Sequence, residues 1–176
     1  MGISSVVNKI LEGADIRTVL IKEDFDDETV FTYDPLVFND ATLLSGADIE
    51  DYVPKELWKA RADWWTKGAP SETNAYYAYK DGSDINKMSS PVDVDKLVRP
   101  ALYIANNLDD TDYVIGDKFK FAGKIFTVVS NDYAFCDTDI GYWMFDAHSS
   151  RYKGSAIQKY IHNWFNSHKN EVPEKI

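Results

Sequence analysis

The stretch that decides the fold is KFKFAGKIFTVV, which runs from Lys118 to Val129. Two alternating segments are joined by Ala122-Gly123, and this pattern fits a two-residue β-hairpin in which residues 121 and 124 face each other. The residues that this register turns toward the core are Phe119, Phe121, Phe126 and Val128. The residues on the opposite face are Lys118, Lys120, Ile125 and Thr127. The division is typical of an antiparallel sheet with one buried face.

The clearest helix follows this hairpin and begins at Ser155, with Gln158 as the partner in a capping box. Its apolar residues recur at helical spacing and are Ile157, Tyr160, Ile161, Trp164 and Phe165. We expect this helix to pack on the sheet. A second, shorter helix is predicted after Ser45, where Asp48 supplies an acidic variant of the capping box. Pro54 should interrupt it before one or two further helical turns.

The rest of the chain predicts shorter elements. A helix should begin at Ser4 or Ser5 and end before Gly13, and a strand should cover residues 18–21. A tyrosine-rich strand is expected at residues 76–79, closed by Asp81-Gly82. The sequence thus predicts one α+β domain over residues 1–176, with an antiparallel sheet and two or three helices. Its parts are an N-terminal extension (1–42), two halves (43–104 and 114–168) and a frayed tail (169–176).

Composition limits the classes of partner. The net charge of −10 disfavours direct nucleic-acid binding, because such proteins neutralise phosphates with Lys and Arg. The acidity has two explanations that stay open here: solubility, or a surface that competes with nucleic acid for a basic partner. No apolar run reaches the roughly 20 residues that a membrane helix needs, and no signal peptide is apparent. We therefore expect a cytoplasmic protein without membrane contact.

The residues that usually carry chemistry are sparse. Cys136 is the single cysteine, which excludes an intramolecular disulfide and a multi-thiolate zinc site, and it is predicted to be a buried, inert thiol. The histidines are His148, His162 and His168, and the last two should point in different directions on a helix. No phosphate loop, nucleophile elbow or zinc-protease motif occurs. We expect no catalytic residue, no metal and no cofactor, although an enzyme of unfamiliar type stays open.

Several stretches together resemble a known domain family. They are the Trp-Trp loop of residues 63–67, the aromatic strand 76–79 with its turn 81–83, the strand Val98-Arg99-Pro100-Ala101-Leu102-Tyr103-Ile104, the hairpin after Gly116-Asp117, and the helix 155–165. Over about residues 43–166 the chain is similar to an uncharacterised domain family of bacteria and their phages. That family is distantly similar to formylglycine-generating-enzyme-like and C-type-lectin-like folds. The resemblance implies a C-type-lectin-like scaffold.

The order of these stretches departs from the family. In the family the hairpin and helix precede the Trp-Trp loop, whereas here they follow it. This implies a circular permutation in which residues 105–113 join the old ends and the strand at Val98 lies beside the ribbon near Gly116. An exchange of halves between two chains, giving a homodimer, or a fusion of two truncated copies would give the same order. The family's cysteine-oxidising relatives need paired cysteines, and its calcium lectins need an oxygen-rich loop; neither is found.

An excess of aromatic residues on a loop-rich segment indicates a binding surface. The residues predicted to contact a partner are Trp64, Trp65, Lys67, Tyr77, Tyr79 and Arg99. Because neighbouring side chains in a strand face opposite ways, one of Trp64 and Trp65 should be core and the other exposed. A salt bridge is the alternative explanation for Arg99.

The sequence leaves two functions open. The first is a non-enzymatic module that binds a protein, with a glycan as the less favoured ligand. The second is an acidic inhibitor, from a phage or mobile element, of a host nucleic-acid-handling enzyme.

Overall fold

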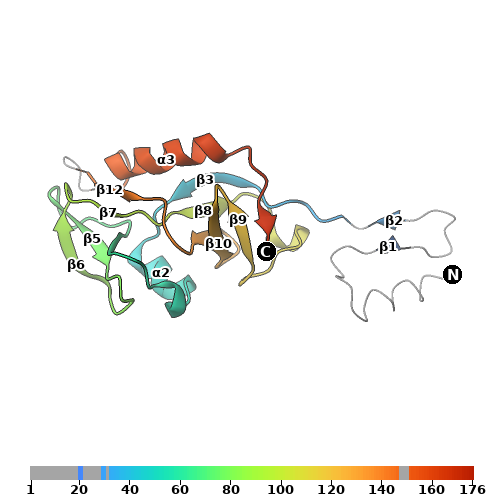
Figure 1. Cartoon of the computed structure of the whole chain (residues 1–176), viewed down its shortest axis with the longest axis horizontal. Helices are drawn as coiled ribbons and strands as arrows, with labels where there is room; N and C mark the ends of the chain where they lie inside the picture. The colour runs from blue at the N-terminus through green and yellow to red at the C-terminus, as the bar shows by residue number, and fades with distance from the viewer. Residues whose placement is uncertain (1–19, 22–28, 31, 147–150) are drawn as a thin grey trace.

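The computed structural model describes residues 20–21, 29–30, 32–146 and 151–176 (Figure 1). Within these residues the chain is a mixed α+β protein with a six-stranded sheet, a five-stranded sheet and a short pair of strands, β1 (Leu20–Ile21) and β2 (Thr29–Val30). The two α-helices of this part are α2 (Gly46–Tyr52) and α3 (Ala156–His168). The α+β class predicted from the sequence is confirmed.

The six-stranded sheet contains the predicted hairpin. Its strands, in spatial order, are β13 (Glu174–Lys175), β9 (Lys118–Phe121), β10 (Lys124–Val128), β11 (Tyr133–Cys136), β8 (Ala101–Ile104) and β3 (Phe38–Thr42), and all neighbours are antiparallel. Phe121 lies opposite Lys124, as the two-residue turn predicts. All four residues assigned to the core face are buried.

Thr127 differs from the predicted division of the hairpin, because it is buried on the face expected to meet solvent. Its hydroxyl donates to a carboxylate oxygen of Asp137 at 2.5 Å and accepts from Lys118 Nζ at 2.6 Å. Lys118 also contacts Asp137 directly. A hydroxyl whose donor and acceptor capacity is satisfied in this way can be buried at little cost.

The strand that follows Val98 does not lie beside the hairpin. β8 pairs with β11 and β3, so β11 and β10 stand between it and β9. The predicted neighbouring of these strands, which the permuted lectin order required, is therefore wrong. The two predicted halves nevertheless join within one chain, because β8 of the first half pairs with β11 of the second.

The five-stranded sheet holds the Trp-Trp segment. Its strands, in spatial order, are β12 (Tyr142–Trp143), β7 (Lys96–Leu97), β4 (Trp64–Trp65), β5 (Asn74–Ala78) and β6 (Ile85–Pro91). β4 and β7 are parallel and the other pairs are antiparallel. The central position of β4 leaves neither of its faces free, since Trp65 joins one hydrophobic core and Trp64 the other.

Both predicted capped helices form. The Ser45 hydroxyl accepts from the Asp48 N–H, and the Ser155 hydroxyl accepts from the Gln158 N–H. In α3 the residues Ile157, Ile161 and Phe165 are buried in the larger core, and the helix lies along β3 (Figure 1). The predicted packing of this helix on the sheet is confirmed. After Pro54 the chain forms a single helical turn, the 3₁₀ helix η1 (Lys55–Leu57), which is the lower limit of the prediction.

The two ends of the chain differ in how far they match the elements predicted from the sequence. The predicted helix near residues 4–13 lies outside the described residues, and β1 covers Leu20–Ile21 of the predicted strand. The tail expected to fray instead adds β13 to the edge of β9. Lys175 anchors it, because its ammonium group donates to the Asp112 carbonyl at 2.6 Å and lies 3.0 Å from Asp117. In the described part of the chain, no helix has both the length and the apolar character to span a membrane.

Candidate functional site

Three of the six residues predicted to contact a partner are core residues. Trp64, Trp65 and Arg99 are at most 1% exposed. The indole N–H of Trp64 donates to the Trp58 carbonyl at 3.1 Å, and that of Trp65 donates to the Trp143 carbonyl at 2.8 Å. The expectation that one of the two tryptophans faces solvent is therefore wrong, and in this structure none of the three is available for a partner.

Arg99 has a structural role that does not depend on a direct carboxylate contact. Its guanidinium group donates to the carbonyl oxygens of Leu57 (2.7 Å), Cys136 (3.1 Å) and Asp137 (3.0 Å), and more weakly to that of Trp58 (3.4 Å). The rings of Trp64 and Phe135 each lie 4.6 Å from its central carbon. Burial lowers the pKa of Arg99 to about 10. The side chain joins η1 to the end of β11, in place of the salt bridge considered from the sequence.

The other three predicted residues, Lys67, Tyr77 and Tyr79, are partly exposed. Tyr77 and Tyr79 contact each other edge to face at 5.5 Å. Lys67 lies apart from them, with its ammonium group 5.3 Å from the ring centroid of Tyr152. Tyr77 and Tyr79 thus lie together with part of each ring exposed, while Lys67 belongs to a different surface beside α3.

Tyr77 lies in a row of side chains that crosses the five-stranded sheet. Trp143 is opposite Lys96, Trp65 is opposite Tyr77, and Tyr77 is opposite Met88. The Lys96 ammonium group lies 5.5 Å from the Trp65 ring and 4.1 Å from the Tyr77 ring, covering Trp65. We call Met88, Tyr77, Lys96 and Trp143 the aromatic row. At about 4.8 Å between strands, it extends about 19 Å.

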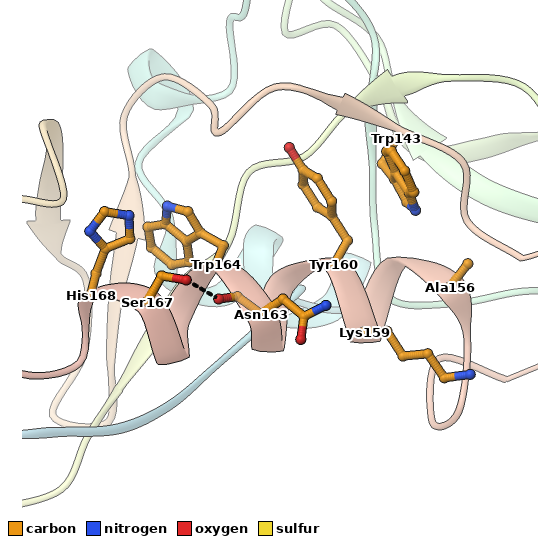
Figure 2. A pocket seen from close by; sticks show the side chains of 8 residues that line it. All are labelled: Trp143, Ala156, Lys159, Tyr160, Asn163, Trp164, Ser167 and His168. Atoms are coloured by element: carbon orange, nitrogen blue, oxygen red, sulfur yellow. Dashed lines mark hydrogen bonds between the residues drawn. The ribbon is translucent and has the colours of Figure 1, made fainter.

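The aromatic row ends in a groove between β12 and α3. Figure 2 shows its side chains: Trp143 from the strand, with Tyr160, Trp164 and His168 in one row along the helix. A second row on the helix consists of Lys159, Asn163 and Ser167, with Ala156 at one end. We call these residues together the aromatic groove, and its volume is about 570 Å³.

The stack of Trp143 on Tyr160 is the structural centre of this groove. The two rings are nearly parallel, at an angle of 11° and a centroid distance of 4.9 Å. The Tyr160 hydroxyl donates to the Ile140 carbonyl at 2.8 Å, which fixes the ring. Gly141 makes this possible, because its φ is 118° and an added Cβ would lie 2.9 Å from the Tyr160 hydroxyl. Trp143 nevertheless remains 39% exposed.

Carboxylates near the groove are already engaged. Asp139 forms two hydrogen bonds of 2.9 and 3.0 Å with Arg61, and Glu171 pairs with His168 at the end of α3. Burial alone would raise the pKa of Asp139, but hydrogen bonds from Arg61 and the Gly141 N–H outweigh it and lower that pKa. The lining itself contains Lys159 and no carboxylate. The groove therefore favours neutral or anionic ligands.

The cysteine and the described histidines, which could carry chemistry, do not form a reactive site in the described part of the chain. Cys136 is completely buried, and burial raises its pKa to about 11, so the thiol is protonated at neutral pH. His162 lies 3.4 Å from Asp40, and His148 lies outside the described residues. Among residues 32–146 and 151–176, no three His, Cys, Asp or Glu side chains gather as metal ligands would.

Trp143 and the exposed sides of Tyr160 and Trp164 were not among the residues predicted to contact a partner. The helix pattern assigned both of the latter to the core, although its five apolar residues span about 140° at 100° per residue. A stripe of that width is wider than one buried face, and this was the available signal for the groove. Comparison of the chain with protein-family models, with curated proteins and with solved structures found no match.

Proposed function

We propose that this chain is a non-enzymatic binding module that recognises a protein partner through the aromatic row and the aromatic groove. The observation that carries the proposal is Trp143: it is stacked on Tyr160, held by the backbone of β12, and still 39% exposed. Tryptophan and tyrosine give large contact area with few rotatable bonds, and for this reason they dominate binding hot spots. The surface joins Tyr77, which was predicted from the sequence and is contacted by Tyr79, to residues on α3.

A protein is a better match than a glycan because the surface is long and open. The row of about 19 Å continues into the groove, whereas a short glycan would use one or two stacking rings. The exposed apolar members, Met88 (52%) and Trp143 (39%), lie at opposite ends of the row. The proposal includes a cytoplasmic setting and requires no cofactor.

Affinity capture with matched variants tests the proposal. Trp143→Ala removes the exposed ring but leaves the backbone carbonyl that accepts from Trp65. Tyr52→Ala is the control, because Tyr52 is a 48% exposed aromatic on α2, outside both surfaces. We expect Trp143→Ala to reduce capture of a specific protein about tenfold, with Tyr52→Ala unchanged. Equal capture by the two variants would remove the support for this surface.

A second candidate function, mimicry of nucleic acid by an acidic inhibitor, has its own observation. Exposed carboxylates of Asp34, Asp109, Asp110 and Asp132 lie near the turn η2 (Leu108–Asp110), where the Asp34 N–H donates to the Asp110 carbonyl. Such a surface would bind a basic groove through charge. Binding should then weaken steeply between low and high salt. Binding that is insensitive to salt would exclude this function and leave the aromatic surface.

The resemblance to the bacterial and phage domain family stays a proposal. It is supported by the pairing of the Trp-Trp strand β4 with the aromatic strand β5. The separation of β8 from β9 counts against the permuted order. The proposed binding function depends on the exposed surface and not on this assignment.

A further inference from the structure

We propose that the aromatic groove binds a proline-rich segment of the partner, in the polyproline II conformation, that carries acidic residues beside its prolines. This inference rests on the proposed function and names the chemistry of the partner at that site. Three independent properties of the groove support it: the spacing of its rings, its unused hydrogen-bond donors, and its charge.

The spacing of the rings suits an extended chain that lies along α3. Tyr160, Trp164 and His168 follow at intervals of four residues, which places them about 6 Å apart along the helix axis. A polyproline II segment rises about 3.1 Å per residue, so about four residues span the row. Trp143 extends the row beyond Tyr160 (Figure 2). Trp143 stacks on Tyr160 and Trp164 contacts His168, so the place for a proline ring is between Tyr160 and Trp164.

The groove offers hydrogen-bond donors that have no acceptor in the described part of the chain. The indole N–H groups of Trp58, Trp64 and Trp65 all donate to backbone carbonyls. Within the described residues, by contrast, the indole N–H groups of Trp143 and Trp164 have no acceptor. A polyproline II segment lacks internal hydrogen bonds and presents its carbonyl oxygens outward, so it supplies acceptors and, at proline, no competing donor.

The charge of the groove selects the residues between the prolines. Lys159 lines the groove and makes no ion pair among the described residues, and Lys96 is the cross-strand neighbour of Trp143. The neighbouring carboxylates Asp139 and Glu171 are paired with Arg61 and His168. In a protein of net charge −10, a groove lining with Lys159 and no carboxylate favours glutamate or aspartate in the bound segment over lysine or arginine.

The test titrates the full chain, labelled with ¹⁵N at its five tryptophans, with synthetic peptides. The probes are a Pro-Pro-Glu repeat, a Pro-Pro-Lys repeat of equal length, and a Gly-Ser-Glu repeat that keeps the charge but not the polyproline conformation. We expect the Pro-Pro-Glu peptide to shift the indole signals of Trp143 and Trp164, and to leave those of the buried Trp64 and Trp65 in place. Each control peptide should bind at least about tenfold more weakly.

Two variants make the result specific. Trp143→Ala should weaken the Pro-Pro-Glu peptide about tenfold, and Lys159→Glu should reverse the preference between the Glu and Lys peptides. Equal shifts from Pro-Pro-Glu and Gly-Ser-Glu, no shift at millimolar peptide, or shifts only with an oligosaccharide would overturn the inference. If capture of a protein still depends on Trp143 after such a result, the binding surface stands and only the ligand is wrong. If capture also ignores Trp143, both proposals fail.

Discussion

Replacement of Arg99 by methionine tests whether this residue is structural or belongs to a binding surface. The change keeps a long side chain between Trp64 and Phe135 but removes all donors to the four carbonyls. Trp58 keeps the Trp64 indole as a donor, so the carbonyls of Leu57, Cys136 and Asp137 lose most. At about 1–3 kcal/mol for each unsatisfied buried group, we expect a loss of about 3–5 kcal/mol in the free energy of unfolding.

Two further variants separate geometry from charge at this position. Arg99→Lys retains the cation but not the planar fork that reaches both η1 and β11, so we expect it to lose at least about 2 kcal/mol. Arg61→Met is the comparison variant, because Arg61 is 56% exposed and loses only its pair with Asp139, so we expect it to destabilise the chain less than Arg99→Met does. Urea unfolding followed by tryptophan fluorescence and by circular dichroism measures all three. If Arg99→Met stays within about 1 kcal/mol of the unchanged chain, the structural role assigned to Arg99 is refuted.

Three other predictions concern Cys136, the tail and Trp143. The buried Cys136 thiol should react with a disulfide reagent only as fast as the protein opens. Its pKa of about 11 in the folded chain lies above the ordinary 9.0, so the free energy of unfolding should fall as the pH rises from 9 to 11, and Cys136→Ala should not show this fall. Removal of residues 173–176 should lower the free energy of unfolding by about 1–2 kcal/mol, because β13 and the Lys175 hydrogen bond are lost. An unaltered melting temperature would count against the pairing of β13 with β9. Trp143→Ala should lower stability by about 1 kcal/mol, seen as a small shift of the urea midpoint; a loss above 3 kcal/mol would make Trp143 a core residue.

The local structure of the hairpin and the helices could be predicted from sequence because their signals are local. Ser45 and Ser155 cap helices through bonds to residues three positions ahead. The turn Ala122-Gly123 sets the hairpin register by itself, and both of its residues adopt a positive φ. Such features depend on neighbours in the chain and require no knowledge of the whole fold.

The strand order and the binding surface could not be predicted because they depend on distant contacts. Alternation along β4 predicts one exposed tryptophan, but the rule holds only for a strand with a solvent face, and Trp64 and Trp65 each meet a different core. In the same way, β11 inserts between the hairpin and β8 without any signal in either strand. Trp143 gains its partner Tyr160 only when β12 is brought against α3.

In-cell photo-crosslinking tests the central claim most directly, because it reports which surface touches a partner. A photoreactive phenylalanine analogue is placed at position 143 in the groove and, in a separate chain, at position 52 on α2. The aromatic-surface proposal predicts a discrete crosslinked protein from position 143 and none from position 52. A crosslink from position 52 alone would contradict it.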